Sequence, residues 1–255
     1  MMLALQANRS AFGAKLTEQP LMQNLLADLC VESEAHTLLA MRMARLFNDS
    51  VNHERAGNAD HESGHIYRVG IAVSKYYITK RLPNLVYECM EAHGGNGFVE
   101  DFPMARMYRH APLNSIWEGS GNVMTLDVLR AAKHLPLLMQ EIKECIPLGN
   151  VAMNAYIQTL EKDLYRMLND TNNPESMLAL QRHARNLVDR LAIALQGSVV
   201  LRFGCPIMAE MYVESRVFNN GMDSRGMNFG STVYSQSNLN RVLDANIPTG
   251  LLLSV

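Results

Sequence analysis

The chain has 255 residues, enough for one large domain or two, and 48% of them are hydrophobic, which suffices for a sizeable core. Its formal net charge of -2 gives no overall attraction to nucleic acid or to an anionic membrane. The four cysteines lie far apart without a Cys-x-x-Cys pair, which predicts reduced thiols and excludes a disulfide framework. No secretory leader is seen, and the apolar tail at 251–253 is too short to span a bilayer. We expect a soluble intracellular protein, cytoplasmic or mitochondrial.

Helical periodicity dominates the first part of the chain. Apolar residues recur at helical spacing over residues 20–46, which predicts one long amphipathic helix that begins at Pro20. After a polar link, the spacing predicts a second long helix over residues 66–91. Pro83 either kinks this second helix or marks its last third.

The apolar register changes beyond about Leu135, where Pro and Gly residues interrupt the chain. Further helices are predicted at 151–168, from Pro174 after a capping Asn173, from Pro206, and at 233–243, with a loop at 219–230. No alternating strand pattern of convincing length is present. The fold class is therefore all-α, an antiparallel helical bundle (domain 1–135) followed by a second helical unit (domain 136–255).

The stretch from Gly94 to Asn122 reads GGNGFVEDFPMARMYRHAPLNSIWEGSGN and is the most informative part of the chain. A glycine cluster leads through basic residues to one carboxylate, Glu118, which stands between Trp117 and Gly119. Glycine permits the close approach of a ligand, and an indole can exclude water on the other side. This arrangement is typical of a ligand loop that carries a general base.

The stretch resembles the C-terminal signature of the acyl-CoA dehydrogenase family. It has the family's GG-x-G-[YF] turn, a Pro with spaced Arg residues, and an aromatic-E-G-[ST] loop in one register. The form SIWEGSGN followed by MTLDVLRA is most similar to the branch named for the bacterial alkylation-response protein AidB. Residues 9–13 also match the family's R-x-x-F-G, which opens the first long helix of its C-terminal helical domain.

This resemblance implies α,β-desaturation of an acyl-CoA thioester. Glu118 falls on the family's catalytic position, where a carboxylate removes the α-proton while the β-hydrogen leaves as hydride to FAD. Trp117 and Gly119 would line the acyl-CoA site. Some family members carry the base on an upstream helix, and Glu118 at the loop position favours the loop. The alternative is that Glu118 is a surface carboxylate near the N-terminus of the helix after Ser120.

The resemblance also implies contacts with FAD. Arg9 would approach the pyrophosphate, with which a guanidinium forms bidentate pairs, and Phe12 would lie close to the cofactor. Gly95 would approach the cofactor of a neighbouring subunit, which implies a homo-oligomer, a dimer or a tetramer. Ser120 and Asn122 would contact the flavin, and Ser120 is also the expected N-cap of the following helix. Without the resemblance, Arg9 and Phe12 read as a frayed terminus.

The chain departs from the family pattern at several positions. Glu91 replaces a Gln that contacts adenosine in many members, and a carboxylate cannot donate as an amide does. Arg109-His110 replaces a common Arg-Asp pair, which removes a structural ion pair, and we interpret Arg106 and Arg109 as loop braces. Two domains precede this region in family members, so the resemblance implies that the chain corresponds to a C-terminal half.

The second unit resembles the extra C-terminal domain of the AidB-like branch, which has been linked with DNA binding and tetramer assembly. Acidic residues alternate with its arginines, so nucleic-acid binding has weak support and solvated helix faces are favoured. These arginines are Arg182, Arg185, Arg190, Arg202, Arg216, Arg225 and Arg241.

His61 and His65 have the spacing of metal ligands on a helix, but Gly64 predicts a solvated turn there, so no metal site is expected. Three hypotheses for function remain. The chain is part of an FAD-dependent dehydrogenase, a non-catalytic module for oligomerisation or DNA binding, or an acyl-ligand sensor that does not turn over.

Overall fold

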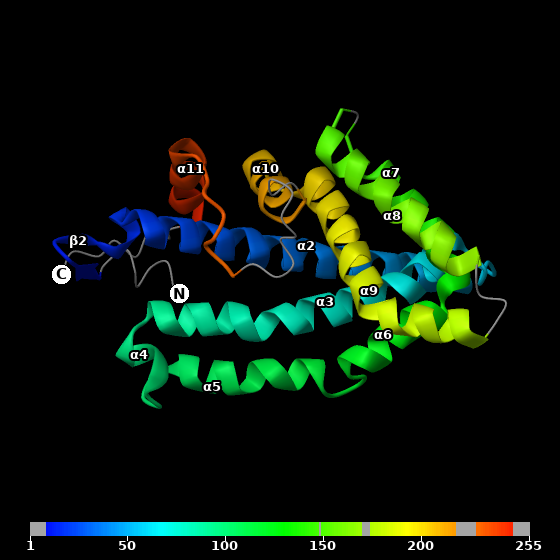
Figure 1. Cartoon of the computed structure of the whole chain (residues 1–255), viewed down its shortest axis with the longest axis horizontal. Coiled ribbons are helices and arrows are strands. Elements are labelled where there is room, and N and C mark those ends of the chain that lie inside the picture. The colour runs from blue at the N-terminus through cyan, green and yellow to red at the C-terminus, as the bar shows by residue number, and fades with distance from the viewer. Residues whose placement is uncertain (1–8, 148, 170–173, 218–227, 247–255) are drawn as a thin grey trace.

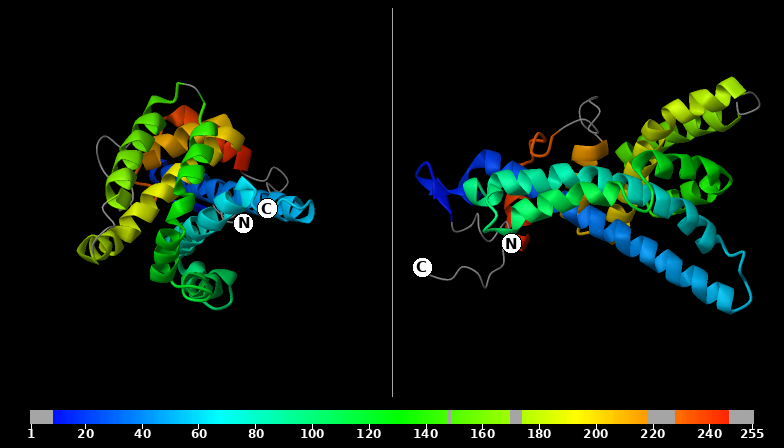
Figure 2. Two further views of the ribbon diagram at one scale, coloured as in Figure 1. Left: turned by 90° about the vertical axis from the view of Figure 1, so that its right-hand side faces the viewer. Right: turned by 90° about the horizontal axis from the view of Figure 1, so that it is seen from below.

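Two long antiparallel helices form the frame of the molecule (Figure 1). α2 (Pro20–Arg55) begins at the predicted proline, whose fixed φ suits the first turn of a helix, and α3 (Glu62–Ala92) continues through Pro83 without ending there. The closed end of this helical pair, around residues 56–61, projects beyond the second half of the chain (Figure 2). Both predicted long helices are confirmed.

The computed structural model describes residues 9–147, 149–169, 174–217 and 228–246. Most of the predicted loop at 219–230 lies outside them, as do Asn173, Arg225 and the apolar tail. Shorter elements complete the first half: β1 (Ser10–Ala11), β2 (Ala14–Lys15), η1 (Leu16–Glu18), α4 (Gly95–Phe98), α5 (Pro103–His110), η2 (Ala111–Ser115), α6 (Gly121–Arg130) and η3 (Ala132–His134). The second half contains α7 (Leu135–Glu144), α8 (Val151–Asn169), α9 (Pro174–Phe203), α10 (Pro206–Tyr212), the π-helical turn η4 (Val213–Val217) and α11 (Gln236–Asn246).

The architecture is all-α, as predicted, and the helices predicted in the second half are present, with α11 beginning three residues later than expected. None of the helices in the described ranges combines the length and the apolar character needed to cross a bilayer. All four cysteines are unpaired, in agreement with the prediction of reduced thiols.

The segment at 9–13, which resembles the family's R-x-x-F-G, precedes the first long helix. It forms a small hairpin, in which Ser10 pairs with Lys15 in antiparallel register. Phe12 and Gly13 make the turn with φ of 54° and 86°. Two-residue hairpin turns favour positive φ at both positions because their twist then matches that of the strands. The glycine therefore serves a hairpin turn and not a helix start.

The stretch at 94–122 corrects one prediction, because much of it is helical. α4, α5 and η2 occupy most of it and pack along α3, on the side away from α2 (Figure 1). Pro103 stands at the start of α5, where its missing N–H costs nothing. The irregular part is confined to the short connections, of which residues 116–120 are one.

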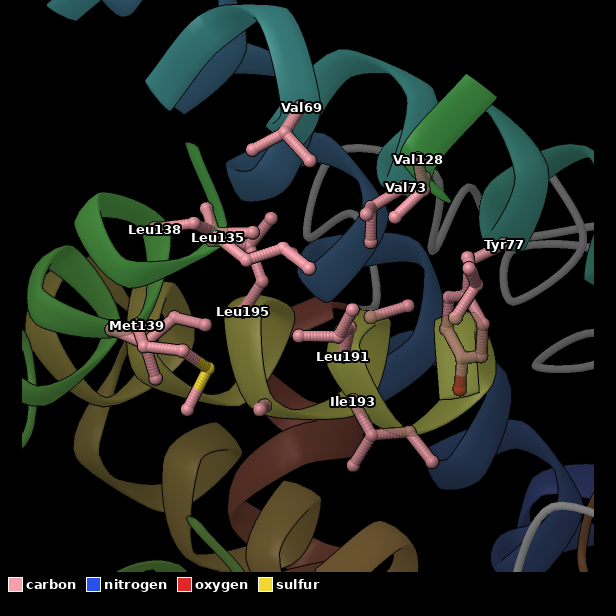
Figure 3. Close-up of a cluster of buried hydrophobic side chains, with 14 of the residues drawn as sticks. Val69, Val73, Tyr77, Val128, Leu135, Leu138, Met139, Leu191, Ile193 and Leu195 are labelled. Atoms are coloured by element: carbon pink, nitrogen blue, oxygen red, sulfur yellow. The ribbon is translucent and has the colours of Figure 1, made fainter. Parts of the chain in front are cut away.

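One hydrophobic core joins the two halves of the chain. Val73 from α3, Leu138 from α7 and Leu195 from α9 are fully buried and point toward one another (Figure 3). Each such side chain contributes about 1.5–3 kcal/mol when it is removed from water. The domain boundary between residues 135 and 136 stays a prediction, and it falls where α7 begins inside this core.

A second buried feature is a group of four charged residues, which we call the buried ion cluster. Asp28 and Glu32 lie on α2, Arg81 on α3 and Arg216 in η4. The Arg216 Nη2 atom is 2.6 Å from Asp28 Oδ1 and 3.0 Å from Glu32 Oε2, and Arg81 also binds Glu32. Burial alone would raise the pKa of Glu32, but the two guanidinium groups hold that pKa well below its usual range. The cluster balances two negative charges with two positive ones.

Arg216 was considered above as part of a basic or solvated helix face, and its position shows that this is wrong. Its side chain is only 6% exposed, so it belongs to the interior and cannot contribute to a surface for DNA. The cluster also holds the C-terminal part of the chain, since Asp28 accepts hydrogen bonds from the backbone N–H of Gly230 (2.8 Å) and from the hydroxyl of Tyr234 (3.1 Å). The Phe229 ring lies 4.9 Å from the Arg81 guanidinium carbon.

Removal of Arg216 is expected to destabilise the protein strongly. Arg216→Met leaves buried carboxylates without their partner, and breaking a buried pair in this way costs about 3–5 kcal/mol. The free energy of unfolding in urea measures the effect. Arg109→Met is the matched control, because the Arg109–Glu100 pair is exposed to solvent and its loss should change the stability little. Equal losses in the two variants would contradict the importance of the cluster.

His61 and His65 lie at the closed end of the helical pair, where the prediction of a solvated turn is wrong because α3 already begins at Glu62. α3 begins at Glu62, so His65 lies in its first turns, and the His61 ring accepts a hydrogen bond from the Ser63 N–H as an N-cap. The His65 Nε2 atom lies 2.7 Å from Asp60 Oδ1, and the His65 ring stacks on the ring of His134 in η3. In the described part of the chain, no group of three or more potential ligands could hold a metal ion.

Acid should weaken the packing of η3 against α3. Burial lowers the pKa of His134 below its ordinary value of 6.5, with His65, Lys133 and Arg68 adding to the effect. The unfolded chain therefore takes up a proton before the folded one, and stability falls as the pH drops below about 6.5. Urea midpoints at pH 7.5 and 5.5 test this, with a smaller difference expected for His134→Asn. His183→Asn, at an exposed position on α9, should keep the wild-type difference.

Candidate active site

Glu118 has an unusual backbone conformation. It lies between η2 and α6 with φ of 51°, and Gly119 follows with φ of 110°. Among the described residues, only Glu118 and Phe12 adopt positive φ without being glycine, and both were predicted as site residues. A non-glycine residue in this region persists only where its surroundings hold it, and such residues concentrate at functional sites.

Lys75 supplies part of that support. Its ammonium group donates hydrogen bonds of 2.6 Å to the carbonyl oxygens of Trp117 and Gly119, on either side of Glu118. Lys75 was not among the site residues predicted from the sequence. The available signal was a single cation in the apolar stretch of α3 at 69–77, where a charge requires a partner.

The start of α6 follows directly. Ser120 occupies the predicted N-cap position with extended backbone, but its side chain makes no capping hydrogen bond. The first N–H groups of α6 therefore depend on other partners, and the N-terminus of a helix favours an anion. Asn122 accepts a hydrogen bond of 2.9 Å from the Arg185 side chain of α9, which links this turn to the second half of the chain.

The surroundings of Glu118 are open in this chain. Trp117 is 54% exposed, and Glu118 is itself exposed. The indole therefore does not exclude water from Glu118 without a further wall. The dry environment expected of a base acting on a weakly acidic proton has to come in part from outside the described residues.

A second group of predicted residues lies at the C-terminal end of α3. The Arg9 guanidinium donates a hydrogen bond of 3.0 Å to the carbonyl oxygen of Ala92 and lies over Gly94, whose φ is 62°. A cation at this end of a helix is favoured by the helix dipole. Phe12 is fully exposed at the tip of the hairpin, and Gly95 begins α4 with open space around it. Arg9 is thus anchored to the fold and not frayed.

The structure separates the predicted residues into two groups. Glu118 is tied to the middle of α3 through Lys75, whereas Arg9 is tied to its end through Ala92. At about 1.5 Å per residue, these two points of α3 lie about 25 Å apart. Gly95 and Phe12 belong to the end group, and one chain therefore does not bring all the predicted contacts together.

The structure explains one departure from the family pattern, the replacement of the common Arg-Asp pair by Arg109-His110. Its guanidinium binds Glu100 through two hydrogen bonds of 2.5 and 2.8 Å, so the ion pair expected to be lost is made with another carboxylate. This contact lowers the pKa of Glu100. Arg109 acts as the predicted brace, between α5 and the connection that precedes it.

Two neighbouring glycines of α4 should respond differently to alanine. A Cβ at Gly97 would lie 2.0 Å from the backbone carbonyl oxygen of Met90, which cannot move without shifting α3. We expect Gly97→Ala to cost about 1–3 kcal/mol, more than the helix propensity that alanine adds. Gly95→Ala meets nothing within 4 Å and is the matched control, within about 0.5 kcal/mol of wild type. Thermal and urea unfolding compare them, and a neutral Gly97→Ala would show that α4 does not pack this closely.

The helical bundle and the turn before α6 define the chain as an all-α unit with an exposed carboxylate, Glu118, on a turn of positive φ. Residues 1–133 match the acyl-CoA dehydrogenase C-terminal domain, and the chain belongs to this family.

The similar proteins are longer than this chain. AidB of Escherichia coli (strain K12) is 29% identical over 218 residues, which cover 86% of this chain and 36% of AidB. Acyl-CoA dehydrogenase family member 11 of Caenorhabditis elegans is 34% identical over 122 residues, which cover 48% of this chain and 19% of that protein. The chain thus spans only about a third of AidB and less of the second relative.

Solved structures show the same fold. An acyl-CoA dehydrogenase from Bacillus anthracis complexed with FAD aligns over 100% of this chain and 49% of its own, with a TM-score of 0.66 and 18% identity. ACDH-11 of Caenorhabditis elegans in complex with C11-CoA aligns over 95% of this chain and 39% of its own, with a TM-score of 0.64 and 20% identity. At these identities the likeness establishes the fold alone.

Proposed function

We propose that this chain supplies part of the active site of an FAD-dependent acyl-CoA dehydrogenase, with Glu118 as the base that removes the α-proton of the thioester. The observation that carries the proposal is the backbone of Glu118, held at positive φ between two carbonyl groups bound by Lys75. The sequence of this turn, Trp117-Glu118-Gly119-Ser120, resembles the aromatic-E-G-[ST] loop that carries the base in the family. The acyl-CoA in the ACDH-11 structure and the FAD in the Bacillus anthracis structure support the same ligands for this chain.

The role of Glu118 is limited to proton transfer. A carboxylate accepts the α-proton when it is within hydrogen-bond reach of that carbon and water is excluded. The exposure of Glu118 and Trp117 suits a site whose opposite wall is formed by another part of the protein. Trp117 and Gly119 would then face the acyl-CoA, with the glycine allowing close approach.

The chain offers suitable groups for FAD. The uncapped first turn of α6 at Ser120 and Asn122 can donate N–H groups to an anion, and the open space at Gly95 lets a ligand approach the backbone. The exposed ring of Phe12 offers an apolar face, and Arg9 supplies a guanidinium. When bound, FAD would accept the β-hydrogen as hydride.

We also propose that complete sites form between copies of the chain in a homo-oligomer. The separation of about 25 Å along α3 supports this, because the loop of Glu118 and the group around Gly95 would then serve different cofactors. The closed symmetry common among homo-oligomers would repeat the arrangement in each copy.

Glu118→Gln tests the catalytic proposal. In protein loaded with FAD, acyl-CoA should bleach the flavin absorbance, and we expect the variant to lose this bleaching because an amide cannot accept the proton. Glu100→Gln is the control, since Glu100 is an exposed carboxylate of the same stretch that pairs with Arg109. Unchanged bleaching in Glu118→Gln would remove Glu118 from the role of base. A protein that takes up no FAD would contradict the assignment for this chain.

A further inference from the structure

We infer that Lys75 is a positioning residue for Glu118: by binding the carbonyl groups on both sides of Glu118, it fixes the backbone that aims the carboxylate. This inference rests on the proposed role of Glu118 as the base. Lys75 contacts the backbone of the turn and not the carboxylate, so it acts through Glu118 and not on the substrate.

The conformation of the turn needs such a clamp. Two successive residues, Glu118 and Gly119, have positive φ, and only the glycine adopts it freely. The strain at Glu118 must be offset by contacts that the relaxed backbone would lose. Two hydrogen bonds of 2.6 Å from one ammonium group are charge-assisted and short, which makes them strong for their kind.

Lysine suits this position because an ammonium group has three donors and no acceptor, so it can serve two carbonyl oxygens at once. The origin of the side chain is rigid, since its neighbours Ser74 and Tyr76 on α3 are buried. Gly119 completes the fit: a Cβ there would lie 2.5 Å from Met124 Cε and 3.7 Å from the Lys75 ammonium. On the side of Gly119, the turn therefore packs against side chains from α3 and α6.

The geometry makes a specific kinetic prediction. Loss of the two Lys75 hydrogen bonds keeps the Glu118 carboxylate but lets the backbone of the turn relax. A small misplacement of a catalytic group costs up to about 100-fold in rate. We expect Lys75→Met to slow the acyl-CoA-dependent bleaching by at least about 10-fold. The affinity for acyl-CoA should change by less than about 3-fold, because Lys75 does not face that ligand in the proposed site.

The test uses Lys75→Met, Lys75→Arg and, as the matched control, Lys80→Met. Lys80 lies on the same helix and is exposed, and its Cε would be 2.5 Å from a Cβ added to Gly121. Among the described residues, no hydrogen bond or ion pair involves the Lys80 side chain. Amide hydrogen exchange of a peptide over 116–122 reports on the turn without any flavin. Unfolding in urea reports on global stability, and flavin bleaching reports on the reaction.

The expected result is faster exchange at 116–122 and slower bleaching in Lys75→Met, with recovery of both in Lys75→Arg, whose guanidinium can also bind two carbonyl groups. Lys80→Met should stay closer to wild type in exchange than Lys75→Met, because Lys80 packs beside Gly121 but donates to neither of the two carbonyl groups. If Lys75→Met does not fold, Lys75→Gln replaces it, because the amide keeps donors but loses the charge, and slower bleaching is again expected.

Two results would overturn the inference: unchanged exchange at 116–122 in a folded Lys75 variant, or faster exchange with unchanged bleaching. Equal losses in the methionine and arginine variants would also overturn it, because they would show that only the packing of lysine matters. If wild-type protein binds FAD but never bleaches, the proposed function fails, while the exchange data still decide whether Lys75 holds the turn.

Discussion

The packing of α2, α3 and the C-terminal segment depends on the neutral ion cluster inside the molecule. Two carboxylates of α2 meet guanidinium groups from α3 and η4, and three of the four side chains are buried while that of Arg81 is partly buried. Isolated buried charges are costly, so these four groups fix one another in a single arrangement. The cluster thus specifies which face of α3 meets α2, whereas apolar contacts alone tolerate small rotations and shifts.

The orientation of α3 determines where both groups of candidate site residues lie. The helix carries Arg81 in the cluster, Lys75 at the Glu118 turn and Ala92 at the contact with Arg9. Arg81 and Lys75 contribute side chains and Ala92 contributes its carbonyl oxygen, so three separate contacts hold one rigid helix. The second half of the chain adds a further restraint through Arg185 on Asn122.

Much of this organisation could be predicted from the sequence. The long helices were predicted from helical periodicity and from prolines at helix starts, because these are local signals. The motif at Glu118 separately indicated a residue that has positive φ in the structure. The hairpin at Phe12 was missed because its strands have only two residues each, too few for an alternating pattern. Arg216 was misplaced because its partner Glu32 is 184 residues away in the sequence, and charge alternation on a helix says nothing about contacts at that separation. Lys75 was missed for a different reason: the sequence shows an isolated cation in an apolar stretch, but its acceptors are backbone atoms, which no residue type identifies.

The two anchor points on α3 also limit how this region can change in length. One residue inserted between Lys75 and Ala92 would turn the end of the helix by about 100° and move it by about 1.5 Å relative to the Glu118 turn. Arg9 and α4 would then lose their contacts with the end of α3, although every residue type was retained. Substitutions within this interval are therefore easier to accommodate than insertions or deletions, and the spacing itself is part of what the sequence encodes.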